Sequence, residues 1–137
     1  MGVWGAGPFE NDGAADWSGE FDDAEPPQRV GLIRDALEAA ANESDYLEVD
    51  YAQAAVAASA VVASRRPGGT DMVSVHAPET LSEGGSLQLT EDLAPLALRA
   101  LDRVVGEDSE WYQLKEESGG LDESLAVLAQ IRRALAS

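Results

Sequence analysis

Apolar residues recur at spacings of three and four along most of this chain, a pattern that predicts amphipathic helices. The pattern predicts helices over about 12–22, 28–41, 51–64 and 121–135, one from Thr90 or Asp92 to Gly106, and a short one after Asp108 or Ser109 that ends at Ser118-Gly119-Gly120. The inward positions we expect include Trp17, Phe21, Val30, Ile33, Leu37, Leu93, Leu96, Leu101, Val104, Trp111, Leu114, Leu125, Leu128, Ile131 and Leu135.

The segment 51–64 differs from the others because it is almost entirely alanine and valine. A helix that is apolar on every side is surrounded by other helices. We therefore expect it to be the buried central rod of the fold, with the alanines of Ala54–Ala63 enclosed by amphipathic neighbours. Asp50 is a good N-cap for this helix, and Gln53 stands three residues later, at the spacing of a capping box.

Two stretches do not follow a helical pattern. The N-terminal residues combine three glycines with Trp4 and Phe9, which predicts a coil pinned to the core by aromatic side chains before Asn11 or Asp12 caps the first helix. Residues 67–90 form a long irregular segment, in which Met72–Val75 alternate weakly like an edge strand and Gly84-Gly85 indicate a turn. This segment is a functional loop, a disordered one or an element that the pattern misses.

A chain of 137 residues fits one domain, and we expect a single helical domain over 1–137. The predicted fold class is therefore all-α: a compact bundle of five to six helices around the Ala-rich helix, with an N-terminal Gly/aromatic coil. The chain has no cysteine, no signal-peptide pattern and no apolar run long enough to cross a bilayer. These observations predict a soluble, cytoplasmic protein.

Charge narrows the choice of partners. The chain has 26 acidic and nine basic residues, which gives a net charge of −17. Direct binding to nucleic acid or to an anionic membrane is disfavoured, because both need a positive surface. Attraction to a basic protein is favoured by complementary fields. The alternative is that the acidic composition serves only solubility or adaptation to a salty cytoplasm.

No pattern in the sequence supplies a nucleophile with its base, a phosphate-binding loop or a metal-ligand set. His76 is the one histidine, and it has no partner motif. Asp12, Asp16 and Glu20 lie one turn apart, but such pairs are expected by chance among 26 acids. We therefore expect no catalytic residue, no cofactor and no metal. A Gly-lined site in which Asn11, Asp12 and Asp16 gather a cation or a basic group remains the alternative.

One resemblance is specific. The opening Gly2-x-Trp4-Gly-x-Gly-Pro-Phe-Glu-Asn-Asp-x-Ala-Ala-Asp-Trp17 resembles the start of a small bacterial family known as domain of unknown function 4259. Asp45-Tyr-Leu-Glu48, the Ala-rich helix and Ala100-Leu-Asp-Arg-Val104 are similar to later blocks of that family. The resemblance covers nearly the whole chain and implies no activity.

The leading hypothesis is a small acidic domain that docks on a basic protein, in its specific form an immunity or inhibitor protein that covers a basic nuclease or toxin. The residues expected to bind the partner are Trp4, Glu10, Asp12, Asp16, Trp17, Glu20, Asp22 and Asp23. A second hypothesis is a structural or regulatory protein that self-associates, as a homodimer, through an apolar helix face. A third is a carboxylate-dependent metal enzyme with Asp12 and Asp16 in its cleft.

Overall fold

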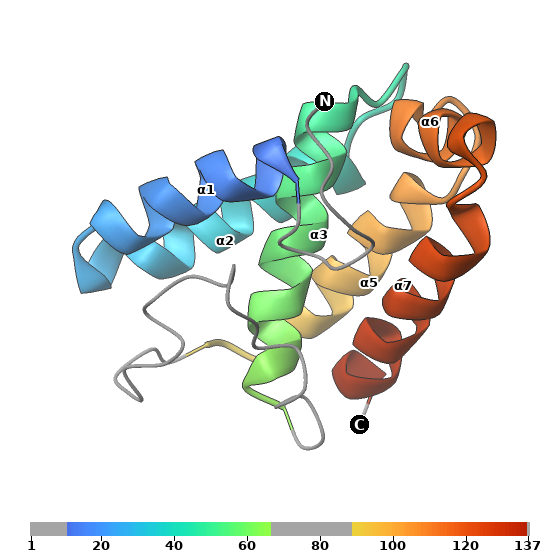
Figure 1. Cartoon of the computed structure of the whole chain (residues 1–137). Helices are drawn as coiled ribbons and strands as arrows, with labels where there is room; N and C mark the ends of the chain where they lie inside the picture. The colour runs from blue at the N-terminus through green and yellow to red at the C-terminus, as the bar shows by residue number, and fades with distance from the viewer. Residues whose placement is uncertain (1–10, 67–88, 137) are drawn as a thin grey trace.

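The computed structural model describes residues 11–66 and 89–136, and within these ranges every regular element is a helix, apart from isolated bridges (Figure 1). The helices are α1 (Asp12–Asp23), α2 (Pro26–Ala41), α3 (Val49–Ser64), α5 (Leu93–Val104), α6 (Glu110–Ser118) and α7 (Leu121–Ala136). The predicted all-α bundle is therefore confirmed. The predicted N-terminal coil with Trp4 and Phe9, the features over 72–85 and His76 lie outside the described residues.

Helix α3 runs through the middle of the bundle, with α1 and α2 on one side and α5 and α7 on the other (Figure 1). Eleven of its 16 residues are buried, and the helix touches α1, α2, α5, α6 and α7. Alanine side chains are short, so that neighbouring helix axes can approach closely on all sides. The prediction of an enclosed central rod is confirmed, although Ala54 itself remains partly exposed.

The outer helices bury the faces that the pattern indicates. On α1, the rings of Trp17 and Phe21 stack with their centroids 5.1 Å apart. On α2, Ile33 and Leu37 are fully buried. The prediction for α6 is only half right: Trp111 is buried, but Leu114 is 44% exposed. Helix α6 has only nine residues, and Trp111 is the one residue of this helix that is buried. Its contact face with the bundle is therefore too narrow to bury Leu114 as well.

The ends of α1 and α2 follow from local chemistry. Asn11 caps α1, because its Oδ1 accepts a hydrogen bond of 2.7 Å from the N–H of Ala14. Helix α2 begins at Pro26, two residues before the predicted start at Gln28. The first positions of a helix need no N–H donor and suit the fixed φ of proline, so Pro26 and Pro27 belong to the helix rather than to the turn before it.

The start of α3 differs from the prediction. Its N-cap residue is Glu48, and Asp50 lies in the first turn, so the expected capping box of Asp50 and Gln53 is wrong. Instead, Oε1 of Glu110 on α6 accepts a hydrogen bond of 2.9 Å from the N–H of Val49. Gln53 is buried, and its Oε1 accepts a hydrogen bond of 3.1 Å from the N–H of Gly13. Distant partners thus replace the local pairing.

Helix α5 follows Asp92 and ends at Val104, two residues before the predicted stop at Gly106. Helix α6 begins directly after Ser109, one of the two predicted positions. Ser109 also caps it, because its Oγ accepts a hydrogen bond of 3.4 Å from the N–H of Tyr112. Gly119 ends α6 with φ +80°, a left-handed conformation that glycine adopts without steric cost.

Arg103 joins the loop before α3 to the loop before α6. Its guanidinium donates hydrogen bonds to four backbone carbonyls, those of Glu43 (2.9 Å), Asp45, Glu107 (2.9 Å) and Asp108 (3.3 Å). The two loops also pair directly, because the N–H of Leu47 donates to the carbonyl of Asp108 at 2.8 Å. The blocks 45–48 and 100–104 therefore meet at one place in the fold.

Candidate functional site

Helix α1 carries an acidic stripe on its outer side. Asp12, Asp16 and Glu20 are exposed and lie one turn apart along the helix. The opposite side of α1 holds its buried residues: Ala14, Trp17, Ser18 and Phe21. Packing of that side against the bundle therefore fixes the carboxylates so that they point towards solvent.

The stripe leads to an open groove of about 590 Å³ between the C-terminal end of α1 and the adjacent face of α2. Three carboxylates line this groove: Glu20 and Asp23 from α1, and Asp35 from α2. The rest of its lining is Ala24, Gln28, Gly31 and Leu32. We call this the α1–α2 groove. It combines acidic groups with an apolar patch, and none of the described residues that line it is basic.

The two arginines of α2 are engaged away from the groove. Nε and Nη2 of Arg29 donate hydrogen bonds, each 3.1 Å, to the carbonyls of Phe21 and Asp22 at the end of α1. Nη1 of Arg34 forms a salt bridge of 2.5 Å with Asp92. Each arginine thus stabilises a helix–helix contact, and neither lines the groove.

Arg34 also controls the titration of its partner. The hydrogen bond from Arg34, and then one involving Thr90, lower the pKa of Asp92 from 3.8 to about 2. Within the described ranges, the only other salt bridge joins Arg132 to Asp102 at 2.8 Å. Asp12, Asp16, Glu20, Asp23 and Asp35 take part in neither salt bridge. The hydrogen bond with Asp92 raises the pKa of Arg34, and of these acids Asp35 also contributes to that rise through its charge.

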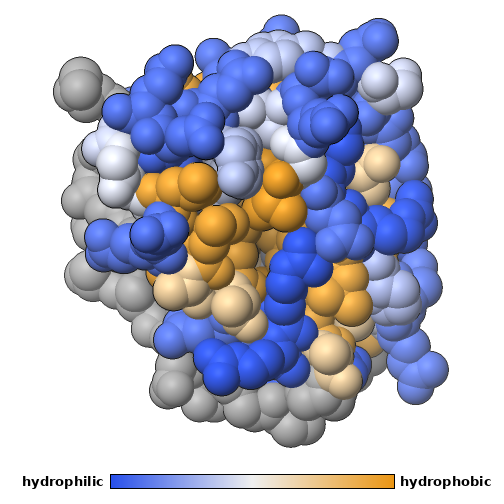
Figure 2. All heavy atoms as spheres, turned by 90° about the vertical axis from the view of Figure 1, so that its right-hand side faces the viewer, coloured by the Kyte–Doolittle hydropathy of each residue, from blue (hydrophilic) through white to orange (hydrophobic). Residues whose placement is uncertain are grey.

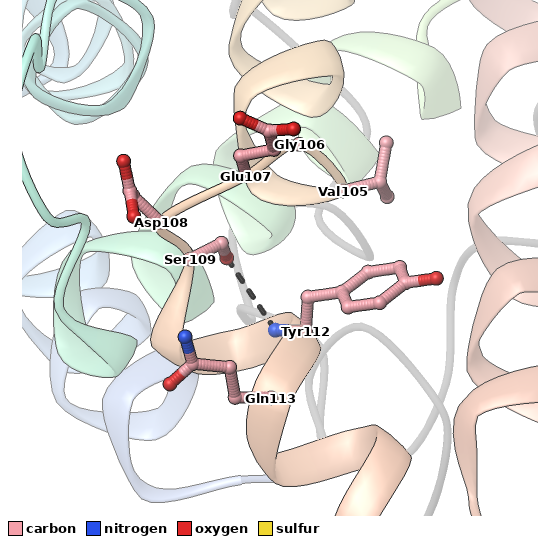
Figure 3. Close-up of a pocket in the computed structure, with 7 residues that line it drawn as sticks. All are labelled: Val105, Gly106, Glu107, Asp108, Ser109, Tyr112 and Gln113. Atoms are coloured by element: carbon pink, nitrogen blue, oxygen red, sulfur yellow. Dashed lines mark hydrogen bonds between the residues drawn. The ribbon is translucent and has the colours of Figure 1, made fainter.

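A second hollow, of about 560 Å³, lies where the loop 105–109 enters α6 (Figure 3). In Figure 3 the Tyr112 ring lies to one side of this hollow and Gln113 to the other. The Oε1 of Gln113 already accepts a hydrogen bond of 2.8 Å from the hydroxyl of Tyr46. Asp108 has φ +57° here, a strained value for a residue with a Cβ. The hollow is thus built from groups that hold the two loops together.

The structure places the predicted partner-binding residues as follows. Asp12, Asp16, Glu20 and Asp23 are exposed on α1, and Asp22 is half-buried. Trp17 is only 7% exposed and packs in the core, so it does not present its ring to a partner. Trp4 and Glu10 lie outside the described residues.

Sequence reasoning missed the contribution of α2 to the groove. Asp35 lines it beside Glu20 and Asp23, and Leu32 supplies its apolar part. A signal was present in the pattern, because Leu32 is apolar but falls outside the buried stripe of Val30, Ile33 and Leu37. A leucine in such a place marks a partly exposed apolar position.

Two further observations concern other kinds of site. Within 11–66 and 89–136, the structure holds no group of three or more histidine, cysteine, aspartate or glutamate side chains placed to bind a metal. Asp12 and Asp16, the residues named for a carboxylate cleft, lie on the open outer side of α1. None of the helices in the described part of the chain is long and apolar enough to span a membrane.

Comparison with known families identifies the chain. The family model for DUF4259, described as a domain of unknown function, matches residues 2–126. The chain belongs to the DUF4259 family. The matched range covers the acidic stripe, the α1–α2 groove and the two loops that Arg103 joins, and it ends within α7. No curated protein and no solved structure matches the chain, so DUF4259 membership adds no activity to the geometry described above.

Proposed function

We propose that this DUF4259 protein is an acidic interaction domain that binds a basic segment of another protein in the α1–α2 groove. The observation that carries this proposal is the convergence of Glu20, Asp23 and Asp35 around an apolar patch at Leu32. Among residues 11–66 and 89–136, no arginine or lysine lines the groove.

The groove suits the chemistry of a lysine or arginine side chain. The aliphatic stem of such a residue packs on apolar surface while its charged head stays at a polar edge. Here Leu32 and Gly31 offer the surface, and the carboxylates of Glu20 and Asp35 offer charge-assisted hydrogen bonds. Asp12 and Asp16 extend the negative field along α1 and would raise the rate of encounter with a basic partner.

A more specific form of the proposal is an immunity or inhibitor function, in which the domain covers a basic nuclease or toxin. It is supported by the net charge of −17 and by the small size of the chain. The same charge argues against nucleic acid as a direct ligand, because a nucleic-acid-binding surface needs cations to replace counterions.

The test is capture of partners from a lysate of the source cell on the immobilised protein at low and at moderate salt, with the retained proteins identified by mass. We expect a basic protein that is retained at low salt and released as salt rises, because screening weakens exposed charge pairs. The triple variant Glu20→Gln, Asp23→Asn, Asp35→Asn should no longer retain this basic protein.

The matched control neutralises three exposed acids elsewhere, through Glu107→Gln, Glu116→Gln and Glu117→Gln. This variant changes the net charge by the same amount and should retain the partner. Equal loss in both triple variants would show that bulk charge alone attracts the protein. Absence of any basic protein at low salt would refute the proposal.

A further inference from the structure

The side of α7 that points away from the core carries a symmetric set of residues. We call it the α7 row: Asp122, Ala126, Ala129 and Arg133. All four are exposed, and their spacing of four, three and four places them within about 60° of one another around the helix. The buried residues of α7 lie on the opposite side: Ser124, Leu128, Ile131, Ala134 and Leu135.

This side of the molecule has apolar surface. Figure 2 looks onto the α7 side of Figure 1 and shows an apolar area in the middle, framed by hydrophilic residues. Leu125, which the apolar pattern placed on the inward face, flanks the α7 row and is only partly buried. It is also not among the residues that pack against the core cluster. A leucine in this position is available to a surface that approaches α7 from outside.

The charged ends of the α7 row are not engaged in salt bridges within the described part of the chain. The side chains of Asp122 and Arg133 take part in neither salt bridge of the described residues, whereas the neighbouring Arg132 pairs with Asp102 at 2.8 Å. The two ends have opposite charge, and only alanines stand between them. Alanine at a helix contact allows axes to approach to about 8 Å.

A second copy of the chain fits this row. If two α7 helices pack antiparallel about a twofold axis that passes midway between Ala126 and Ala129, Asp122 lies opposite the partner's Arg133, and Ala126 lies opposite the partner's Ala129. Twofold symmetry repeats each contact, so both ends of the pair gain a salt bridge. A parallel arrangement would instead place like charges together.

We propose that the α7 row is the contact surface of an antiparallel homodimer. The proposal is independent of the α1–α2 groove, which lies on other helices. One helix pair is a small interface, and a net charge of −17 on each copy opposes association. The dimer is therefore weak and concentration-dependent, and it is favoured at about 0.15 M salt, where the Debye length of about 8 Å screens the overall repulsion.

The test is sedimentation equilibrium of the full chain over a range of concentrations. Arg133→Asp and Asp122→Arg each turn two attractive pairs into two repulsive ones, and each should weaken dimerisation by about tenfold or more. An equimolar mixture of the two variants should associate again, since one then has two basic ends and the other two acidic ends. The double variant Asp122→Arg/Arg133→Asp should also dimerise.

Controls separate this contact from general charge effects. Arg65→Asp changes the charge at the end of α3, and Asp12→Arg changes it in the first turn of α1, each by the same amount as the test variants. Both should dimerise like the parent chain, and circular dichroism should show that all variants are folded. A parent chain that stays monomeric at about 1 mM, near the weak limit of specific association, would overturn the proposal. So would single variants that dimerise normally, or a mixture that fails to associate.

Discussion

Gly13 on α1 and Gln53 on α3 are in direct contact across the helix pair. The N–H of Gly13 donates a hydrogen bond of 3.1 Å to Oε1 of Gln53, and a Cβ placed on Gly13 would lie 2.9 Å from Cβ of Gln53 and still closer to that oxygen. Real Cβ atoms essentially never approach this closely. The contact therefore sets how near the start of α1 can come to the central helix.

Gly13→Ala should destabilise the protein by about 1–3 kcal/mol, because the methyl group displaces Gln53 and leaves a buried amide without its partner. The measurement is the free energy of unfolding from chemical denaturation. In the double variant Gly13→Ala/Gln53→Ala, the two effects should not add, since both remove the same contact.

Gly19→Ala, on the same helix, is the matched control. A Cβ at Gly19 would meet nothing within 4 Å, so alanine should stabilise the helix by about 0.5–1 kcal/mol. If Gly13→Ala and Gly19→Ala changed the free energy of unfolding equally, the contact between Gly13 and Gln53 would not constrain the helix pair.

Replacing Arg103 should separate the two loops that it joins. Arg103→Met removes the donor to four carbonyls and should lower the free energy of unfolding by about 2–4 kcal/mol. Arg103→Lys should recover only part of this loss, because an ammonium group lacks the planar fork of donors. The side chain of Arg99 donates an exposed hydrogen bond of 3.2 Å to Oδ1 of Asn42, and Arg99→Met should change the unfolding free energy by no more than about 0.5 kcal/mol. A similar loss for both arginines would argue against the junction.

The salt bridge between Arg34 and Asp92 should make stability depend on acid pH. The pKa of Asp92 is lowered to about 2, below its ordinary value of 3.8, so its stabilising effect is present above 3.8 and is lost as the pH falls towards 2. The difference in unfolding free energy between the parent chain and Asp92→Asn should therefore be constant near neutral pH, be mostly lost by about pH 2 and vanish below it. The control is Glu91→Gln at the neighbouring exposed position. The difference in unfolding free energy between the parent chain and Glu91→Gln should not show this dependence on pH. If the difference in unfolding free energy between the parent chain and Asp92→Asn persists in acid, the ion pair is not its cause.

The helices were predictable because each has a repeated local signal. A few neighbouring residues are enough to indicate each element. Examples are the apolar spacing of α5, the start of α6 after Ser109 and the run of alanines in α3. The acids of α1 could also be placed on one side of a helix in advance, since Trp17 and Phe21 mark the other.

Contacts between distant segments could not be predicted in this way. Nothing near Val49 in the sequence indicates that Glu110 accepts its hydrogen bond, and nothing near Gly13 indicates Gln53. The α1–α2 groove depends on how two helices pack, so Asp35 joined the candidate site only when the packing was known. Exposure of Leu114 likewise depends on the width of the contact that α6 makes.

The cap that Glu110 provides for α3 has a consequence for how the chain is made. The two residues are 61 positions apart, so the central helix lacks this partner until residue 110 has left the ribosome. During synthesis, its alanine-rich surface must wait for α5, α6 and α7 before it is enclosed. Assembly of the bundle is thus expected to be a cooperative event that needs the later helices, rather than a stepwise process from the N-terminus.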